Sequence, residues 1–237
     1  MRIRSFIIAY ALVLAILLFA DRRPASIQQD RYSHVVDLTD GRNATGQHAA
    51  AAGSRTRIIA PGALIPGTWA AGQIPPERLV APLVVMGLNA MDGSPQISLD
   101  DIAAWESHHG MIPQGAVVAI RRAGARDHLS TTDLSTTDFS STDLSNNDLS
   151  TTPLPIARDA AMFLIEARYT IAFAVETPVN LTSDRTLARQ LALHGNYVVE
   201  GTARLASLPE TGSLIIVAPA KNKEPGEAPV RILAMVR

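Results

Sequence analysis

Side chains that could bind a metal or act as nucleophiles are few in this sequence. Few of them have the spacing of a known metal-binding or catalytic motif. The chain has six histidines and no cysteine, so any metal site must use histidine and carboxylate ligands. No two histidines are four residues apart, the spacing that places both on one helix face as zinc ligands. The sequence also lacks a Gly-x-Ser-x-Gly nucleophile elbow and a glycine-rich phosphate loop.

The stretch TRIIAPGALIPG, residues 56–67, has the residue spacing of a metal-binding loop but contains no histidine, carboxylate or cysteine. It continues into TWAAGQIPPERLVAPLVV, where the first carboxylate is Glu77. Whether this protein is an enzyme therefore depends on whether a motif without these ligands can still bind a metal.

Residues 55–86 resemble the signature of the cyclase family, whose best-known members are the bacterial kynurenine formamidases. The family pattern is His-x-Gly-Thr-His-x-Asp-x-Pro-x-His, followed by a glycine-containing turn, an Ile-Pro pair, Leu-Val-x-Pro and an apolar strand. Residues 105–121, WESHHGMIPQGAVVAIR, and the segments 193–221 and 228–236 are also similar to family segments. The frame of the signature is present here at Thr56, Pro61, Gly67, Gln73, Ile74, Pro75, Leu79, Val80 and Pro82.

The resemblance implies a divalent metal, usually zinc, but most of the positions that would hold it are substituted. Glu200 is the one retained ligand position, and the position of the acid or base histidine is Ala63. A catalytic zinc needs about three protein donors and an open position for water. We therefore expect no cofactor, and zinc or manganese only if other ligands are used. The substituted ligand positions are Gly53, Arg57, Ile59 and Ala188.

Two residues near the motif are candidates for the substrate pocket. Arg57 would repel a dication, and we hypothesise that it pairs with Glu200 where the metal would otherwise lie; the alternative is that Arg57 faces solvent. Trp69 follows the motif directly and is a candidate for stacking on the aromatic amide or formamide that suits the family's pocket.

Three functions from different classes remain open. The first is an exported cyclase-family protein without metal-dependent catalysis, whose pocket binds a small molecule or nothing. The second is a metal-dependent hydrolase of aryl formamides or related amides, of the arylformamidase type. The third is a structural or interaction module presented at the membrane.

A net charge of −1 and the lack of a basic stripe argue against a nucleic-acid partner. The resemblance implies a homo-oligomer.

The first twenty residues stand apart in composition. Arg2 and Arg4 precede sixteen uncharged residues, which is typical of a signal peptide. The cleavage site is poor, because Leu18 stands where a small residue is preferred. An uncleaved N-terminal anchor is the alternative. We expect residues 21–33 to be a linker and the folded part, 34–237, to be periplasmic or secreted, or else anchored to the membrane by residues 1–20.

The elements around the motif indicate a mixed α/β, strand-rich single domain of the cyclase/kynurenine formamidase type, rather than a doubly wound parallel sheet. In the helix at 98–110, Ser98 is the cap, Gly110 is the stop, and Ile102, Trp105 and His109 share one face. The other predicted helices are 155–169 and 183–195, and the predicted strands are 34–40, 81–90, 115–122, 170–175, 196–201, 212–220 and 230–237.

A pentapeptide-type repeat insertion is expected at 127–154, because five units in 130–154 carry an apolar residue at every fifth position. One coil of a β-solenoid is too little to bury these residues, and the spacing of the aspartates does not suit a calcium loop. We therefore predict a flexible surface insertion that carries no chemistry.

Overall fold

The computed structural model describes residues 32–40, 56–88, 96–122, 152–221 and 226–237. In these residues one sheet runs in the order β1-β8-β2-β6-β5-β4-β3-β7, and β7 also pairs with β8, so that the sheet closes on itself. Its strands are β1 (His34–Asp37), β2 (Arg57–Ile59), β3 (Val80–Gly87), β4 (Val117–Arg121), β5 (Ala172–Val175), β6 (Tyr197–Glu200), β7 (Ser213–Pro219) and β8 (Glu227–Val236).

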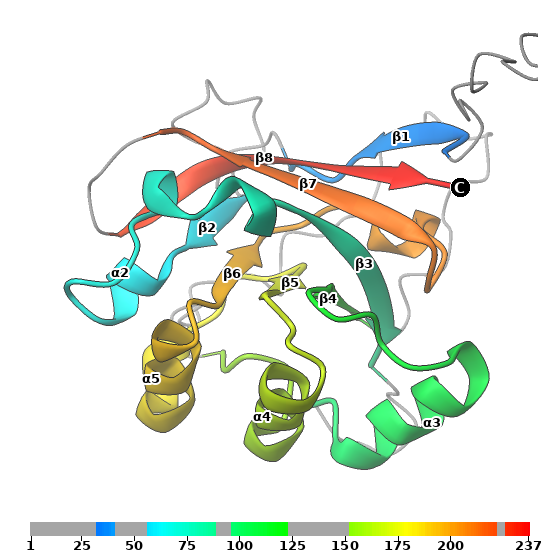
Figure 1. Cartoon of the computed structure of the whole chain (residues 1–237), viewed down its shortest axis with the longest axis horizontal. Helices are drawn as coiled ribbons and strands as arrows, with labels where there is room; N and C mark the ends of the chain where they lie inside the picture. The colour runs from blue at the N-terminus through cyan, green and yellow to red at the C-terminus, as the bar shows by residue number, and fades with distance from the viewer. Residues whose placement is uncertain (1–31, 41–55, 89–95, 123–151, 222–225) are drawn as a thin grey trace, which may run out of the picture.

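Three helices connect the parallel strands β3, β4, β5 and β6 in turn and lie together on one side of them, as Figure 1 shows. They are α3 (Leu99–His109), α4 (Arg158–Ala167) and α5 (Arg185–Leu193). The long antiparallel strands β7 and β8 cross the other side. The shorter helices are α2 (Pro61–Leu64), η2 (Ala71–Gln73), η3 (Pro76–Arg78), η6 (Leu181–Ser183) and η7 (Leu205–Ser207).

The protein has two hydrophobic cores because the side chains of each strand alternate between the two faces of the sheet. On β4, Val117 and Ala119 point into the space enclosed by the sheet, where they join Tyr197 and Ile232. Val118 and Ile120 point the other way, into the layer between the sheet and the three helices. A mixed, strand-rich α/β domain is therefore confirmed.

The helix predicted at 98–110 is present as α3 with the expected ends. The Ser98 side chain accepts a hydrogen bond from the Asp101 backbone N–H, while the Asp101 carboxylate accepts from Ser98 N. Gly110 ends the helix with a φ of 82°, which favours glycine. The rings of Trp105 and His109 lie 4.7 Å apart on the shared face.

Some boundaries differ from the sequence-based prediction. Helix α4 begins at Arg158 rather than at 155, because Ile156 forms a β-bridge with Ile97 just before it. β2 was not predicted as a strand, since three residues beside a proline give a weak signal. β8 begins at Glu227, before the predicted 230.

The end of the predicted insertion at 127–154 belongs to the folded core. Leu154 is buried in the layer between sheet and helices, and Thr152 O accepts a hydrogen bond from Asn180 N. The rest of the repeat, up to residue 151, lies outside the described residues, as do residues 1–31. Among the helices of the described ranges, none has the length and apolarity needed to cross a membrane.

Candidate functional site

Three positions that the resemblance implied for the metal, Arg57, Ile59 and Glu200, lie where β2 runs between β6 and β8. Arg57 is directly opposite Glu200 of β6, and Ile59 lies between Val198 of β6 and Glu227 of β8. Because alternate residues share a face, Arg57 and Ile59 both belong to the side of the sheet that carries the helices. The side chains of Arg57 and Ile59 therefore lie on the same face of β2.

A cavity of about 440 Å³ lies over this part of the sheet. Its floor comes from β2, β6 and β8, and its walls come from α2 and from the segment after β5, residues 178–182. Most of the side chains are apolar, and two are carboxylates. The lining residues are Ile59, Ala63, Leu64, Pro178, Val179, Asn180, Leu181, Thr182, Glu200 and Glu227.

Glu200 is the buried charged group of this cavity, with only 6% of its surface exposed. Its Oε2 accepts a hydrogen bond of 3.0 Å from the backbone N–H of Val179. Burial raises the pKa of the Glu200 carboxyl, and the nearby carboxylate of Glu227 acts in the same direction. The Val179 hydrogen bond and the positive charge of Arg57 oppose this shift but do not cancel it.

Glu227 is the second carboxylate of the cavity, and it is paired with a cation. Its Oε2 lies 3.1 Å from Arg57 Nε, although Nε forms no well-directed hydrogen bond within the described residues. Both side chains are partly exposed, at 37% for Arg57 and 47% for Glu227. The hypothesised direct pair between Arg57 and Glu200 is not among the ion pairs of the described residues. Arg57 reaches diagonally to the neighbouring strand β8 instead.

The other residues singled out in the sequence are dispersed. Ala63 lines the cavity, as the resemblance implied for its position, but its methyl group has no acid or base chemistry. Ala188 is buried in the apolar layer on α5 and does not line the cavity. Gly53 lies outside the described residues.

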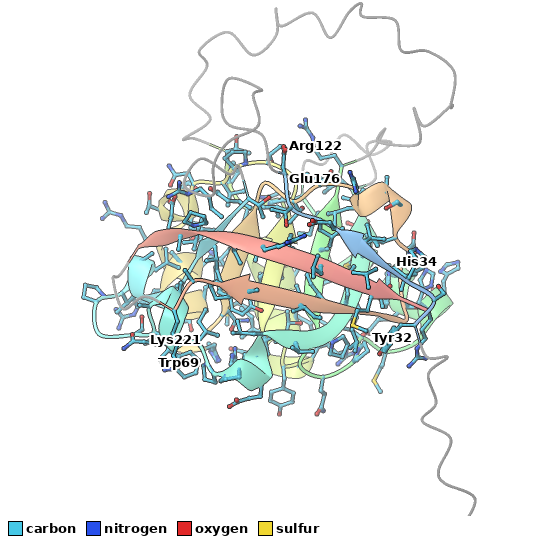
Figure 2. All side chains as sticks on the ribbon, turned by 90° about the horizontal axis from the view of Figure 1, so that it is seen from above. Tyr32, His34, Trp69, Arg122, Glu176 and Lys221 are labelled. Carbon is cyan, nitrogen blue, oxygen red and sulfur yellow. The ribbon has the colours of Figure 1, made fainter. Side chains whose placement is uncertain are left out.

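Trp69 does not line the cavity either. Its ring packs closely against Gly195, where an added Cβ would lie 2.8 Å from Trp69 Cζ3, and the Arg78 guanidinium lies 5.7 Å from the ring centroid. Gly195 precedes β6, whereas Glu200 ends it. In the view of Figure 2, Trp69 lies near one edge of the molecule and Glu176, which directly follows β5, lies toward the opposite edge. A role in substrate stacking stays a prediction.

The donors that the described residues bring to the cavity do not fit a catalytic divalent metal. Zinc in a hydrolase requires about three protein ligands, whereas the cavity offers the carboxylates of Glu200 and Glu227, one of them already paired with Arg57. None of the four histidines in the described segments lines it. Within those segments no three His, Asp or Glu side chains are grouped so that they could hold a metal ion.

Sequence reasoning missed Glu227 and the segment at 178–182. Glu227 belongs to no motif, and it enters the site only through the pairing of β8 with β2, 168 residues away from Ile59 (227 − 59). The sequence signal available for the segment was its position after a buried strand, because loops at the carboxyl ends of parallel strands commonly form binding sites.

Comparisons with known proteins agree with the fold. A family model described as "Putative cyclase" matches residues 22–180, more than half of the 237 residues. No curated protein matches the chain.

Three solved structures show the same architecture. Isatin hydrolase A from Labrenzia aggregata has a TM-score of 0.62 at 22% identity, over 96% of this chain and 99% of that chain. Isatin hydrolase A from Ralstonia solanacearum has the same TM-score and identity, over 86% and 92%. A Bacillus stearothermophilus protein described as a predicted metal-dependent hydrolase has a TM-score of 0.53 at 21% identity, over 86% and 98%. Identities this low establish the fold alone.

Proposed function

This chain belongs to the cyclase family, and we propose that its cavity binds a small molecule without metal-dependent catalysis. The observation that carries the proposal is the presence of aliphatic side chains at Ile59 and Ala63, inside the cavity that the altered signature forms. These side chains cannot donate an electron pair to a metal or exchange a proton with a substrate. The cavity itself persists, with walls suited to an apolar ligand.

Metal chemistry requires more donors than the described residues of this cavity provide. In a metal-dependent hydrolase, the ion lowers the pKa of a bound water so that hydroxide attacks the substrate. Glu200 is held by the Val179 N–H, and Glu227 is held near Arg57, whose fixed positive charge opposes a second cation. The residues of the described site therefore support binding and orientation of a ligand, and no hydrolytic step is assigned to them.

A second candidate function is metal-dependent hydrolysis of an aryl formamide or a related amide. It is favoured by the fold that the chain shares with isatin hydrolases and with a protein described as a metal-dependent hydrolase. It would require zinc or manganese to be held by ligands other than the expected set.

One experiment separates the two candidates. The full chain is purified, dialysed, and incubated with zinc or manganese, and its metal content and its hydrolysis of isatin and of an aryl formamide are then measured. The proposal predicts metal well below one ion per chain and no hydrolysis above background. Stoichiometric metal together with metal-dependent hydrolysis would establish the second candidate.

A restoration series provides the positive control. The substitutions Gly53→His, Arg57→His, Ile59→Asp, Ala63→His and Ala188→His are introduced together, so that imidazole and carboxylate donors stand at the family positions. We expect tight zinc binding to appear in this variant and not in the parent chain. Equal zinc binding by both would argue that the parent already holds the ion.

We also propose that residues 1–20 direct the chain out of the cytoplasm. The support is the sequence itself, in which two arginines precede sixteen uncharged residues. Fractionation of a bacterial host that expresses the full chain should place the protein in the periplasm or at the membrane. The mass of the recovered chain would show whether the segment is cleaved, and recovery from the cytoplasm would reject export.

A further inference from the structure

We propose that the cavity beside Glu200 binds a small molecule that carries a protonated amine on an apolar body. This inference rests on the proposed binding function and adds the chemical class of the ligand. It is argued from three features: a carboxylate oxygen without a partner, the balance of charge around it, and the apolar walls.

The first feature is the free oxygen of Glu200. The side chain is almost fully buried and lines the cavity. Its Oε2 accepts from Val179 N–H, whereas its Oε1 accepts no hydrogen bond within the described residues and is not among their fully buried side-chain atoms without a partner. Because Glu200 lines the cavity, Oε1 is the oxygen that can accept a hydrogen bond from a ligand there. A ligand that offers an N–H group would supply that hydrogen bond.

The second feature is the net charge of the cavity. Two carboxylates line it, Glu200 and Glu227, and the charged group that acts on both is Arg57. Arg57 forms its ion pair with Glu227 and does not line the cavity. Among the described residues, one negative charge therefore remains to be balanced. A monocation balances it, a carboxylate ligand would be repelled, and a neutral donor would satisfy the hydrogen bond but not the charge.

The third feature is the apolar lining around the acid. Ile59, Ala63 and Leu64 contribute from one side, and Val179 and Leu181 from the other. A volume of about 440 Å³ lies toward the small end of ligand pockets. Such a site fits a compact hydrocarbon or aromatic group whose amine points at Glu200.

The test uses three probes of similar size and different charge: 2-phenylethylamine, 2-phenylethanol and phenylacetate. Their affinities for the full chain are measured by calorimetry at neutral pH. We expect the amine to bind at least about tenfold more tightly than the alcohol, and phenylacetate to bind most weakly. Equal affinities for the three probes, or no binding of any of them, would reject the inference.

Variants assign the effect to the carboxylate. Glu200→Gln keeps the shape and an acceptor for Val179 N–H but removes the charge, so it should weaken amine binding at least about tenfold and leave 2-phenylethanol unaffected. Glu166→Gln, on the exposed face of α4, is the matched control and should change neither affinity. A circular dichroism melt of each variant establishes that it is folded. Unchanged amine binding in folded Glu200→Gln would overturn the assignment.

Failure of this inference is distinguishable from failure of the proposed function. If 2-phenylethanol binds as well as the amine and no metal-dependent hydrolysis is found, the cavity is a binding site for a neutral ligand, and only the ligand class is wrong. If isatin or an aryl formamide is hydrolysed with bound metal, the proposed function itself fails.

Discussion

Arg57 and Glu200 lie directly opposite each other on β2 and β6, yet the guanidinium of Arg57 contacts Glu227 on β8. Among the described residues, one oxygen of the buried Glu200 carboxylate thus accepts no hydrogen bond, and the Arg57 guanidinium lies beside the more exposed Glu227. This arrangement supports the proposal of a cavity that binds a ligand without a metal ion, with the Glu200 carboxylate as an acceptor for that ligand.

The buried acid should cost stability at neutral pH. Because the pKa of Glu200 is raised in the folded state above its ordinary value of 4.5, the unfolded chain ionises first as the pH rises, and the folded state is penalised. We expect Glu200→Gln to be more stable than the parent above about pH 5, with the difference vanishing below pH 4. Urea denaturation at several pH values measures this. A variant that is less stable at neutral pH would contradict the assigned cause.

The ion pair between α3 and the end of α4 should have the opposite pH dependence. Arg168 Nε and Nη2 donate to the two oxygens of Glu106 at 2.7 and 2.8 Å, which lowers the pKa of Glu106 below its ordinary 4.5. The stability that this pair contributes is present above pH 4.5 and is lost as the pH falls through the folded pKa.

Arg168→Met should therefore destabilise the protein by about 2 kcal/mol at neutral pH, because Glu106 loses a bidentate partner. It should also flatten the decline of stability below pH 4.5. Arg158→Met, which removes the exposed pair with Asp184, is the control and should cost less. Equal losses in the two variants would show that burial of the first pair has no effect.

Gly195 should tolerate no side chain. Its φ is 69°, and an added Cβ would approach the Trp69 ring to 2.8 Å. We expect Gly195→Ala to cost about 2 kcal/mol, from left-handed backbone strain and from displacement of the ring. Gly67 has a φ of 88°, but no atom of the described residues lies within 4 Å of an added Cβ. Gly67→Ala should therefore lose only the stability that the left-handed backbone strain costs.

A double-mutant cycle with Trp69→Ala isolates the contact at Gly195. In the Trp69→Ala background, the cost of Gly195→Ala should fall to that of the strain alone, about 1 kcal/mol. Thermal denaturation of the four proteins measures the coupling. Additive effects would mean that the ring and the glycine do not interact.

Substitution of the apolar residue should destabilise the protein in the last unit of the repeat and not in the unit before it. Leu154 is buried with 3% of its surface exposed, so Leu154→Ala should cost about 3 kcal/mol of stability. Leu149 occupies the same place in the preceding unit, which we predict to be surface insertion, so Leu149→Ala should be nearly neutral. Chemical denaturation compares the two. A comparable loss at Leu149 would reject the surface assignment of the repeat.

Local signals predicted the helices well and the site only in part. The ends of α3 are fixed by Ser98, Asp101 and Gly110, which act within a few residues of each other. The partner of Arg57 is determined by the pairing of β2 with β8, which is distant in sequence. No local pattern indicates that Arg57 forms its ion pair with Glu227 rather than with Glu200. The resemblance identified the positions of Ile59, Ala63 and Glu200, and all three residues line the cavity.

The central claim is that the substituted cavity does not retain a divalent cation. It is tested most directly by anomalous diffraction at the zinc edge, from crystals of the full chain grown with excess zinc. We predict no anomalous peak at coordinating distance from Glu200, which for a zinc–carboxylate bond is about 2.0–2.2 Å. A strong peak at that distance, with further protein ligands around it, would contradict the account.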